Sequence, residues 1–572
     1  MTDPDDPRHP FRLGLARFQG GDLDGAEAAF RQTLTIDPDH PDALFGSGLC
    51  LEARGKLLEA ESAYRHAAMA RGDFPQALTN LAAVLTQSNR PAEAVELLDR
   101  VLARRPDFEA ARFNRGTAYY ALRRLSEAEA DFRHIVERQP DHAAALNELG
   151  RVLLKQTRAT EAAELFGEGH RQHPLDARFL ANLASALERL NDLAGAESAA
   201  EKALSLDPDA PGLLYLRASL EHRLGRLAEA RAHLDDMLRG ELREEHRSEA
   251  LFELGEVLDK LGETGGAFRA FTDANALRAR NPAAKEADGA RFLARVAAAR
   301  EGFTKERIAA IAARAPVCER LAPVFFVGFP RSGTTLMERA LKAHPEIVTT
   351  DERSPLTPVL AELSESGDYP EDLERLTGKK IKQLQDRFWA EAEAILGQLG
   401  ERRLVDKMPL NIVNLGLANC LFPDARALVA LRDPRDSCLS CFMQRFQFTD
   451  AMINFLDLER TATTYAAVME LWLQYRDGLS LPWLAYRYED LVEDFQGTLK
   501  EALDFIGLPW HEDVMAYAER TKDQVITTPS YRQVTGEIDK KAAGRWRRYR
   551  DELAPILPLL RPLVESFGYP ED

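Results

Sequence analysis

The first half of the chain repeats itself with a period of 34 residues, and this period restricts the fold more than any other feature. One alanine recurs at the same phase in successive units, at Ala26, Ala60, Ala94, Ala128, Ala162, Ala196 and Ala230. A small residue precedes each alanine by twelve positions, as Gly116 precedes Ala128. A proline soon after the alanine, as at Pro38 and Pro106, ends a helix. Because two closely packed helices need small residues where they touch, each unit is predicted to be a helical hairpin.

This period and these positions resemble the tetratricopeptide repeat, a stack of helical hairpins. After Gly240 the register slips by three residues and resumes at Gly255 and Ala267, which indicates an eighth unit. We therefore expect an all-α solenoid of seven to eight repeats over residues 1–280, with a concave groove. Such a groove favours a protein or peptide ligand, and the alternative is a spacer or an oligomerisation scaffold.

The second half of the chain has a different pattern. Residues 281–321 are predicted to form a polar helical junction, and residues 322–572 an α/β domain. Short apolar runs alternate there with helical patterns, at Val324–Val327, Leu404–Val405, Ala427–Leu431 and Trp483–Ala485. Alternating strands and helices predict a P-loop-like domain with a mostly parallel sheet. In such sheets ligands bind beyond the carboxyl ends of the strands.

A glycine-bearing turn from Gly328 to Thr335 follows the first of these strands and precedes a helix. A turn in this position aims backbone N–H groups at a phosphate. Its spacing matches a nucleotide P-loop, but Thr334 stands where the P-loop lysine belongs. A kinase or NTPase needs that lysine and a magnesium site, so we expect a phosphate bound without metal by Arg331, the Gly333 amide and the threonines. The alternative is a tight structural turn.

A second candidate anion site follows the strand at Ala427–Leu431. Arg432 comes directly after this strand, and Ser440 lies eight residues further on. An arginine offers a planar fork of donors to a phosphate, and a serine adds a hydroxyl. The alternative is an arginine paired with a nearby carboxylate. Two phosphate sites on one nucleotide indicate a 3′,5′-bisphosphate.

These motifs together resemble the sulfotransferase superfamily, whose donor is 3′-phosphoadenosine 5′-phosphosulfate (PAPS). The resemblance is carried by Pro330–Leu336, by Arg432 with Ser440, and by Tyr486–Leu491. Further segments are similar to the protein-tyrosine sulfotransferase branch, namely Arg331–Glu352, Asp406–Pro409 and Asp523–Val525. The resemblance covers roughly residues 323–569. Joined to the repeats, the chain looks like bacterial repeat-fused sulfotransferases.

The resemblance implies a role for each matched residue. The 5′-phosphosulfate arm is expected on Arg331, Ser332, Gly333, Thr334 and Thr335. The 3′-phosphate is expected on Arg432 and Ser440, and the rest of the nucleotide on Tyr488, Thr521, Gln524 and Val525. Arg545 stands where the tyrosine branch has a cofactor lysine. Glu352 matches the proposed catalytic base, while Lys407 and Arg331 would stabilise the bridging oxygen as it leaves. The chain departs from the tyrosine branch at Asp351 and Arg353, beside the expected base.

Bulk properties restrict the partners and the compartment. A formal net charge of -18 argues against nucleic acid and against an anionic membrane surface. Five cysteines, an odd and sparse set, indicate a reducing compartment. The acidic start of the sequence does not read as a signal peptide, and no apolar run is long enough for a membrane span. We therefore expect a cytoplasmic protein.

The sequence thus predicts a PAPS-dependent sulfotransferase that moves a sulfuryl group to a hydroxyl acceptor and releases adenosine 3′,5′-bisphosphate, with no metal. We expect the acceptor to be a protein or peptide presented by the repeat domain, while carbohydrate and lipid acceptors stay open. The alternative from another class is an interaction scaffold that binds the nucleotide without turnover. The oligomeric state stays open.

Overall fold

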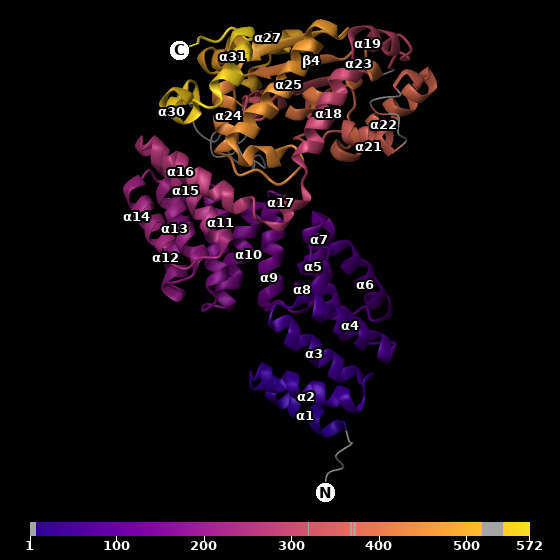
Figure 1. The fold of residues 1–572 in the computed structure, drawn as a ribbon, viewed down its shortest axis with the longest axis vertical. Coiled ribbons are helices and arrows are strands. Elements are labelled where there is room, and N and C mark those ends of the chain that lie inside the picture. The colour runs from indigo at the N-terminus through magenta and orange to yellow at the C-terminus, as the bar shows by residue number, and fades with distance from the viewer. Residues whose placement is uncertain (1–6, 319, 366–368, 370–372, 517–541, 572) are drawn as a thin grey trace. The chain divides into compact units, whose positions relative to one another are not determined.

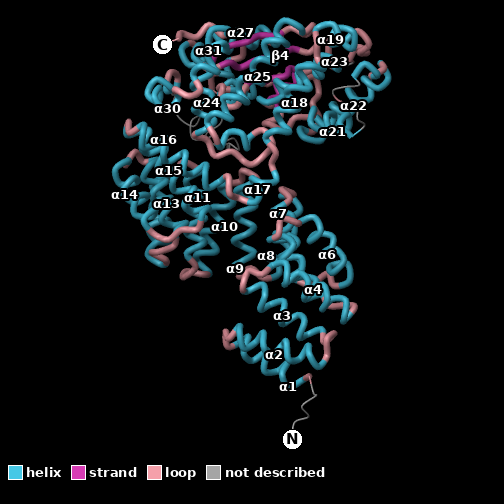
Figure 2. Tube along the Cα trace, viewed as in Figure 1, coloured by secondary structure: helices cyan, strands magenta, loops and turns pink. Residues whose placement is uncertain are grey.

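The fold is taken from a computed structural model that describes residues 7–318, 320–365, 369, 373–516 and 542–571 (Figure 1). The chain packs as two compact units, Met1–Leu213 and Leu214–Asp572. Within the described ranges the first unit consists of helices, and the second adds a parallel sheet, drawn in magenta in Figure 2.

Helical hairpins build the first unit. Its helices are α1 (Arg8–Gln19), α2 (Leu23–Ile36), α3 (Pro41–Ala53), α4 (Leu57–Arg71), α5 (Pro75–Gln87), α6 (Pro91–Arg104), α7 (Glu109–Ala121), α8 (Leu125–Arg138), α9 (Ala143–Lys155), α10 (Ala159–Gln172), α11 (Ala177–Arg189) and α12 (Leu193–Leu206). A Cβ atom added to Gly48 would lie 2.5 Å from the ring of Tyr64, and one added to Gly116 would lie 2.9 Å from the ring of Phe132. The small residue of one helix therefore receives an aromatic ring from the next helix, and the predicted hairpins are confirmed.

The hairpin pattern continues into the second unit. Its first helices are α13 (Pro211–Arg223), α14 (Leu227–Arg239), α15 (Glu244–Leu261) and α16 (Thr264–Arg278). The ring centre of Phe268 on α16 lies 5.2 Å from that of Phe442, and the Asn275 side-chain amide donates to the Phe442 carbonyl over 2.9 Å. The last hairpin thus packs directly on the α/β part of the chain. The domain boundaries at residues 280 and 321 follow the repeat pattern and stay predictions, since compact packing divides the chain elsewhere.

Five parallel strands follow the helices α17 (Pro282–Glu286), α18 (Gly289–Gly302) and α19 (Lys305–Ala312). The strands are β1 (Val324–Gly328), β2 (Ile347–Thr349), β3 (Arg403–Lys407), β4 (Arg426–Leu431) and β5 (Trp483–Arg487). Their order in the sheet is β2-β3-β1-β4-β5, and each neighbouring pair is parallel. The predicted α/β domain with a parallel sheet is confirmed, and β2 is a strand that the sequence analysis missed.

Alternate residues of the central strand enter two separate cores. Val324 and Phe326 share a core with residues of α20 (Thr334–Lys342) and α27 (Phe495–Ile506). Phe325 and Val327 pack instead with residues of the opposite layer. That layer includes α22 (Gly378–Leu396), α23 (Leu415–Leu421) and α25 (Leu458–Gly478). Among the described residues the other α-helices of this part of the chain are α21 (Leu356–Glu365), α24 (Pro434–Phe442), α26 (Tyr488–Glu493), α30 (Arg550–Leu553) and α31 (Leu557–Ser566). Both faces of the sheet are therefore covered, which leaves its carboxyl edge for a site.

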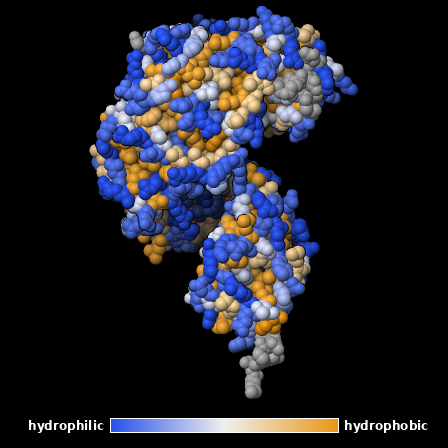
Figure 3. Space-filling model, viewed as in Figure 1, coloured by the Kyte–Doolittle hydropathy of each residue, from blue (hydrophilic) through white to orange (hydrophobic). Residues whose placement is uncertain are grey.

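Within the described ranges, no helix has the length and apolar character that crossing a membrane requires. Figure 3 shows hydrophilic and apolar residues interspersed on the visible face. Scattered surface apolar residues are normal for folded proteins.

Candidate active site

The turn after β1 is bent by two residues in the left-handed region of backbone space. Arg331 has φ 69° and Gly333 has φ 87°. The Ser332 hydroxyl donates to the Phe329 carbonyl over 2.7 Å, and the Cys441 thiol donates to the Pro330 carbonyl over 3.4 Å. Helix α20 begins at Thr334, and the first N–H groups of a helix have no acceptor within it. The turn and the helix start together offer a cradle of donors for an anion.

Arg432 reaches this turn from the neighbouring strand. Gly328 at the end of β1 pairs with Ala430 of β4, so Arg432 leaves the sheet at the edge where the turn begins. One guanidinium nitrogen donates to the Arg331 carbonyl over 2.9 Å, and the other donates to the Ala542 carbonyl over 2.6 Å. The side chain is buried, and its Nε has no hydrogen-bond partner in the described part of the chain. A buried donor without an acceptor points to a ligand at this position.

The two predicted phosphate sites contact each other. The Arg331 Nε donates to the Ser440 hydroxyl over 3.1 Å, and Ser440 lies on α24. Burial, together with the charges of Arg432 and Arg545, lowers the pKa of Arg331 to about 10. Arg331 therefore keeps its charge at neutral pH, and the site gathers three arginines whose mutual repulsion a bound anion would relieve.

Tyr488 joins the turn to Arg432. A Cβ atom added to Gly333 would collide with the Tyr488 ring, so the ring lies directly against the glycine. The Arg432 guanidinium carbon lies 4.8 Å from the centre of the same ring. Gly333 and Arg432 thus lie against the same aromatic ring, close enough for a single mononucleotide to contact both.

A buried ion-pair cluster lies beside the first turns of α20. Lys407 ends β3, and its ammonium lies 3.0 Å from a carboxylate oxygen of Glu338 and within ion-pair distance of Glu352. The Lys407 side chain is 0% exposed, that of Glu338 is 5% exposed and that of Glu352 is 35% exposed. Burial lowers the pKa of Lys407, but the two carboxylates outweigh burial and raise it overall. Thr334 and Glu338 share a face of α20, so this cluster lies about one helical turn from the phosphate turn.

The remaining predicted site residues fall into two groups. Thr521, Gln524 and Val525 lie outside the described residues, so their roles stay predictions. Arg545 is described, and its guanidinium lies 3.0 Å from the carboxylate of Asp259 on α15. The Tyr549 hydroxyl donates to the same carboxylate over 2.7 Å.

Sequence reasoning missed Glu338 and Asp259. Glu338 follows Thr334 by four residues, and this spacing was the available signal that it faces the site. Asp259 lies 286 residues before Arg545 in the chain, and no local pattern predicts that pair.

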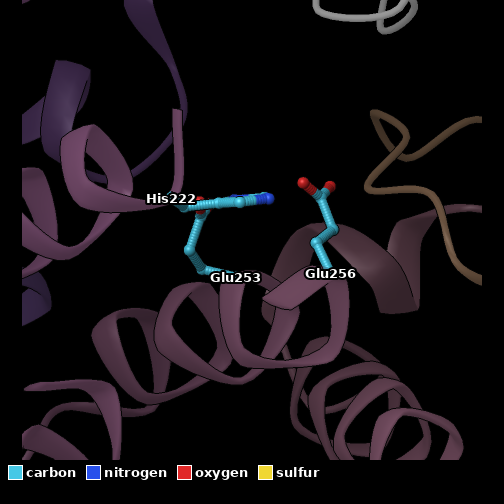
Figure 4. Close-up of side chains that lie close together, drawn as sticks. All are labelled: His222, Glu253 and Glu256. Atoms are coloured by element: carbon cyan, nitrogen blue, oxygen red, sulfur yellow. The ribbon is translucent and has the colours of Figure 1, made fainter. Parts of the chain in front are cut away.

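One histidine and two glutamates gather between α13 and α15 (Figure 4). Their potential ligand atoms lie within 4.8 Å of one another. His222 Nδ1 is already within 2.7 Å of Glu253, and the ring directs its other nitrogen toward Glu256 in Figure 4. One nitrogen is thus engaged in a hydrogen bond to a carboxylate, as expected of a buried imidazole–carboxylate pair. The expectation that the protein needs no metal stays a prediction.

Both halves of the chain match models of known protein families. Residues 323–512 match a model of the sulfotransferase family. Residues 11–68, 147–211 and 182–242 match one tetratricopeptide-repeat model, and residues 85–149 match another.

Individual proteins are similar at low identity. An uncharacterized protein of Aquifex aeolicus is 25% identical over 432 residues, which cover 73% of this chain and 54% of that protein. The chain thus aligns with about half the length of this relative. Protein-tyrosine sulfotransferase A of Caenorhabditis elegans is 27% identical over 263 residues, 44% of this chain and 68% of that protein.

The crystal structure of a tetratricopeptide repeat protein from Parabacteroides merdae is 20% identical, with a TM-score of 0.39, over 44% of this chain and 98% of that chain.

The two sets of family matches assign the parts of the chain. It carries tetratricopeptide repeats followed by a sulfotransferase-family domain that is distantly similar to protein-tyrosine sulfotransferases.

Proposed function

We propose that this protein transfers a sulfuryl group from PAPS to a hydroxyl acceptor. The observation that carries the proposal is Arg432, a buried arginine with no carboxylate within ion-pair distance among the described residues. Its guanidinium and the turn at Gly333 both lie against the ring of Tyr488. Such an arrangement suits a ligand with an anionic group at each end and an aromatic base between.

The residues present fit this donor. Arg331 to Thr335 would hold its 5′ arm, and Arg432 with Ser440 its 3′-phosphate. The donor supplies the sulfuryl group and an anionic leaving group. Glu352 would accept the proton of the acceptor hydroxyl, and Lys407 with Arg331 would offset the charge that develops on the leaving oxygen.

The acceptor class belongs to the proposal as well. We propose a protein or peptide acceptor, because repeat solenoids present extended concave surfaces and the catalytic domain is distantly similar to protein-tyrosine sulfotransferases. Carbohydrate and lipid acceptors are the alternatives. The five cysteines are free thiols, in keeping with the proposed cytoplasmic location.

A second candidate is a scaffold that binds the nucleotide without turnover. It is favoured by one observation, namely that Glu352 is held in an ion pair with Lys407 in this structure. Turnover requires Glu352 to leave that pair, whereas binding alone does not.

Calorimetry and labelled transfer test both candidates. We expect adenosine 3′,5′-bisphosphate to bind equally well with and without magnesium, while tight magnesium-dependent ATP binding would contradict the proposal. Transfer from ³⁵S-labelled PAPS to a lysate, separated into protein, glycan and lipid, then identifies the acceptor class. Glu352→Gln should bind the bisphosphate normally and lose about 100-fold or more in transfer, the range of a lost general base. Glu362→Gln, a carboxylate paired with Lys380 on the surface, is the matched control.

A further inference from the structure

Glu338 and Glu352 hold the same lysine but differ in burial. Glu338 sits on α20, one helical turn after Thr334, and its side chain is 5% exposed. Glu352 follows β2 in a loop, and its side chain is 35% exposed. The Lys407 ammonium between them has no exposed surface. Only Glu352 therefore has room to swing toward an acceptor without exposing the lysine.

The other carboxylates near Lys407 interact with residues other than this lysine. Asp406 accepts hydrogen bonds from Ser354 over 2.7 Å and from Thr350 over 3.1 Å. Asp351 is paired with Lys342 over 2.6 Å. Glu338 is the one buried carboxylate in the described part of the site whose ion pair goes to Lys407.

Burying an ammonium is costly by several kcal/mol unless a counter-ion stays with it. When Glu352 takes up a proton it becomes neutral, and its contribution to holding the charge of Lys407 disappears. The second oxygen of Glu338 is buried and has no hydrogen-bond partner among the described residues, so its negative charge is directed to Lys407. Burial, the largest influence on this carboxyl group, raises the pKa of Glu338 and the lysine opposes that rise.

We propose that Glu338 is a positioning residue, the fixed counter-ion that keeps Lys407 charged and seated beside the phosphate turn while Glu352 leaves the pair to reach the acceptor. This inference rests on the proposed sulfuryl transfer. In that step Glu352 accepts the proton of the acceptor hydroxyl as the hydroxyl oxygen bonds to sulfur. The bond between sulfur and the bridging oxygen breaks, and its electron pair stays on the 5′-phosphate oxygen, whose charge Lys407 and Arg331 offset.

The test follows the binding of adenosine 3′,5′-bisphosphate from pH 7.5 to pH 9.5 by calorimetry, which needs no acceptor, and every variant is made in the Glu352→Gln background, where a neutral amide replaces the second carboxylate of the lysine. In Glu338→Gln on this background the lysine loses both carboxylates that the structure pairs with it, and we expect affinity to fall about tenfold across this range, the size of a lost charge-assisted contact. In the wild type, in Glu338→Asp and in the surface control Glu362→Gln, affinity should change less than about twofold, because Lys407 stays charged.

A double variant keeps the test decisive if the single variant Glu338→Gln does not fold. Glu338→Gln combined with Lys407→Met removes both charges, so it should fold and should bind the bisphosphate with no added pH dependence. Folding of the double variant alone would support the counter-ion role, because an unpaired buried ammonium would then be what unfolds the single variant. A Glu338→Gln profile that superimposes on the wild type would overturn the inference and leave the proposed function intact. A wild type that binds no bisphosphate would overturn both.

Discussion

Arginines are held in opposite ways in the solenoid and in the candidate active site. In the solenoid, Arg112 and Arg115 both pair with Asp131, at 3.2 and 2.7 Å, and the aspartate side chain is only 4% exposed. In the site, Arg432 is also buried, yet among the described residues its side chain donates to two backbone carbonyls and lies against a tyrosine ring. The first arrangement is complete without a ligand, whereas in the second no carboxylate of the described residues forms an ion pair with Arg432, and the charges of Asp436 and Glu489 act on it only from further away.

The difference separates structural arginines from binding arginines. Burying a charge is costly, and a carboxylate offsets that cost within the fold. Carbonyl oxygens satisfy hydrogen bonds but bring no opposite charge, so a bound anion can stabilise the site further. We therefore expect substitutions in the solenoid pair to change stability, and substitutions at Arg432 to change nucleotide affinity.

The largest effect is expected for Asp131→Ala. It removes the buried carboxylate that the two partly buried arginines share and leaves only Asp99 paired with Arg115, which should lower the free energy of unfolding by about 3 kcal/mol. Urea unfolding followed by circular dichroism measures this change. The affinity for adenosine 3′,5′-bisphosphate should stay the same, and a variant as stable as the wild type would contradict the structural role of this cluster.

Arg432→Ala should have the converse effect. Loss of a charge-assisted contact should weaken bisphosphate binding by about 2 kcal/mol, roughly 30-fold, while the unfolding midpoint changes little. Calorimetry measures the affinity. Arg402→Ala, whose guanidinium donates to the carbonyls of Leu399 and Gln398 at the surface, is the control. Equal affinity of Arg432→Ala and the control would remove Arg432 from the nucleotide site.

Much of the second unit could be predicted because its signals are local. The apolar runs gave β1, β3, β4 and β5, and residues that follow parallel strands must meet at one edge. The meeting of Gly333, Arg432, Ser440 and Tyr488 follows from that rule. The three-residue edge strand β2 carries too short a pattern to be recognised.

The rest of the site depends on contacts between distant segments. Whether a given glutamate pairs with Lys407 or faces solvent is decided by packing of α20 against β3, and the sequence spacing alone does not contain that information. The same holds for Asp259, whose position on α15 becomes relevant only because the last hairpin packs on the sulfotransferase-family domain. Burial and charge compensation are tertiary properties, so they appear only once the fold is known.

Arg545 lies between the two classes of arginine and sharpens the comparison. Its charge helps to lower the pKa of Arg331, but the carboxylate of Asp259 already forms an ion pair with it. Arg545→Gln should therefore weaken bisphosphate binding by only about 1 kcal/mol, roughly fivefold. The measurement is calorimetry beside Arg432→Ala. An effect as large as that of Arg432→Ala would show that a carboxylate partner does not mark an arginine as structural.

The smallest expected effect concerns the turns between the helices of the solenoid. These turns and the phosphate turn all contain left-handed residues, but the left-handed residue has a different role in each. Left-handed residues recur there with the repeat period, as glycine at Gly55, as Asn89 and as Thr157 with φ 69°. At Gly333 the left-handed backbone makes room for Tyr488, whereas at Gly55 an added Cβ would meet nothing within 4 Å.

The strain at Thr157 is therefore removable without loss of function. A left-handed conformation is costly for a β-branched residue, and glycine removes that cost. Glycine also increases the conformational entropy of the unfolded chain, which offsets part of the gain in stability. Thr157→Gly should raise the free energy of unfolding by about 0.5 kcal/mol, measured by urea unfolding of the full chain. Thr157→Ala keeps a Cβ at the same φ and should gain less. A destabilised glycine variant would mean that the threonine side chain contributes more to the turn than its backbone strain takes away.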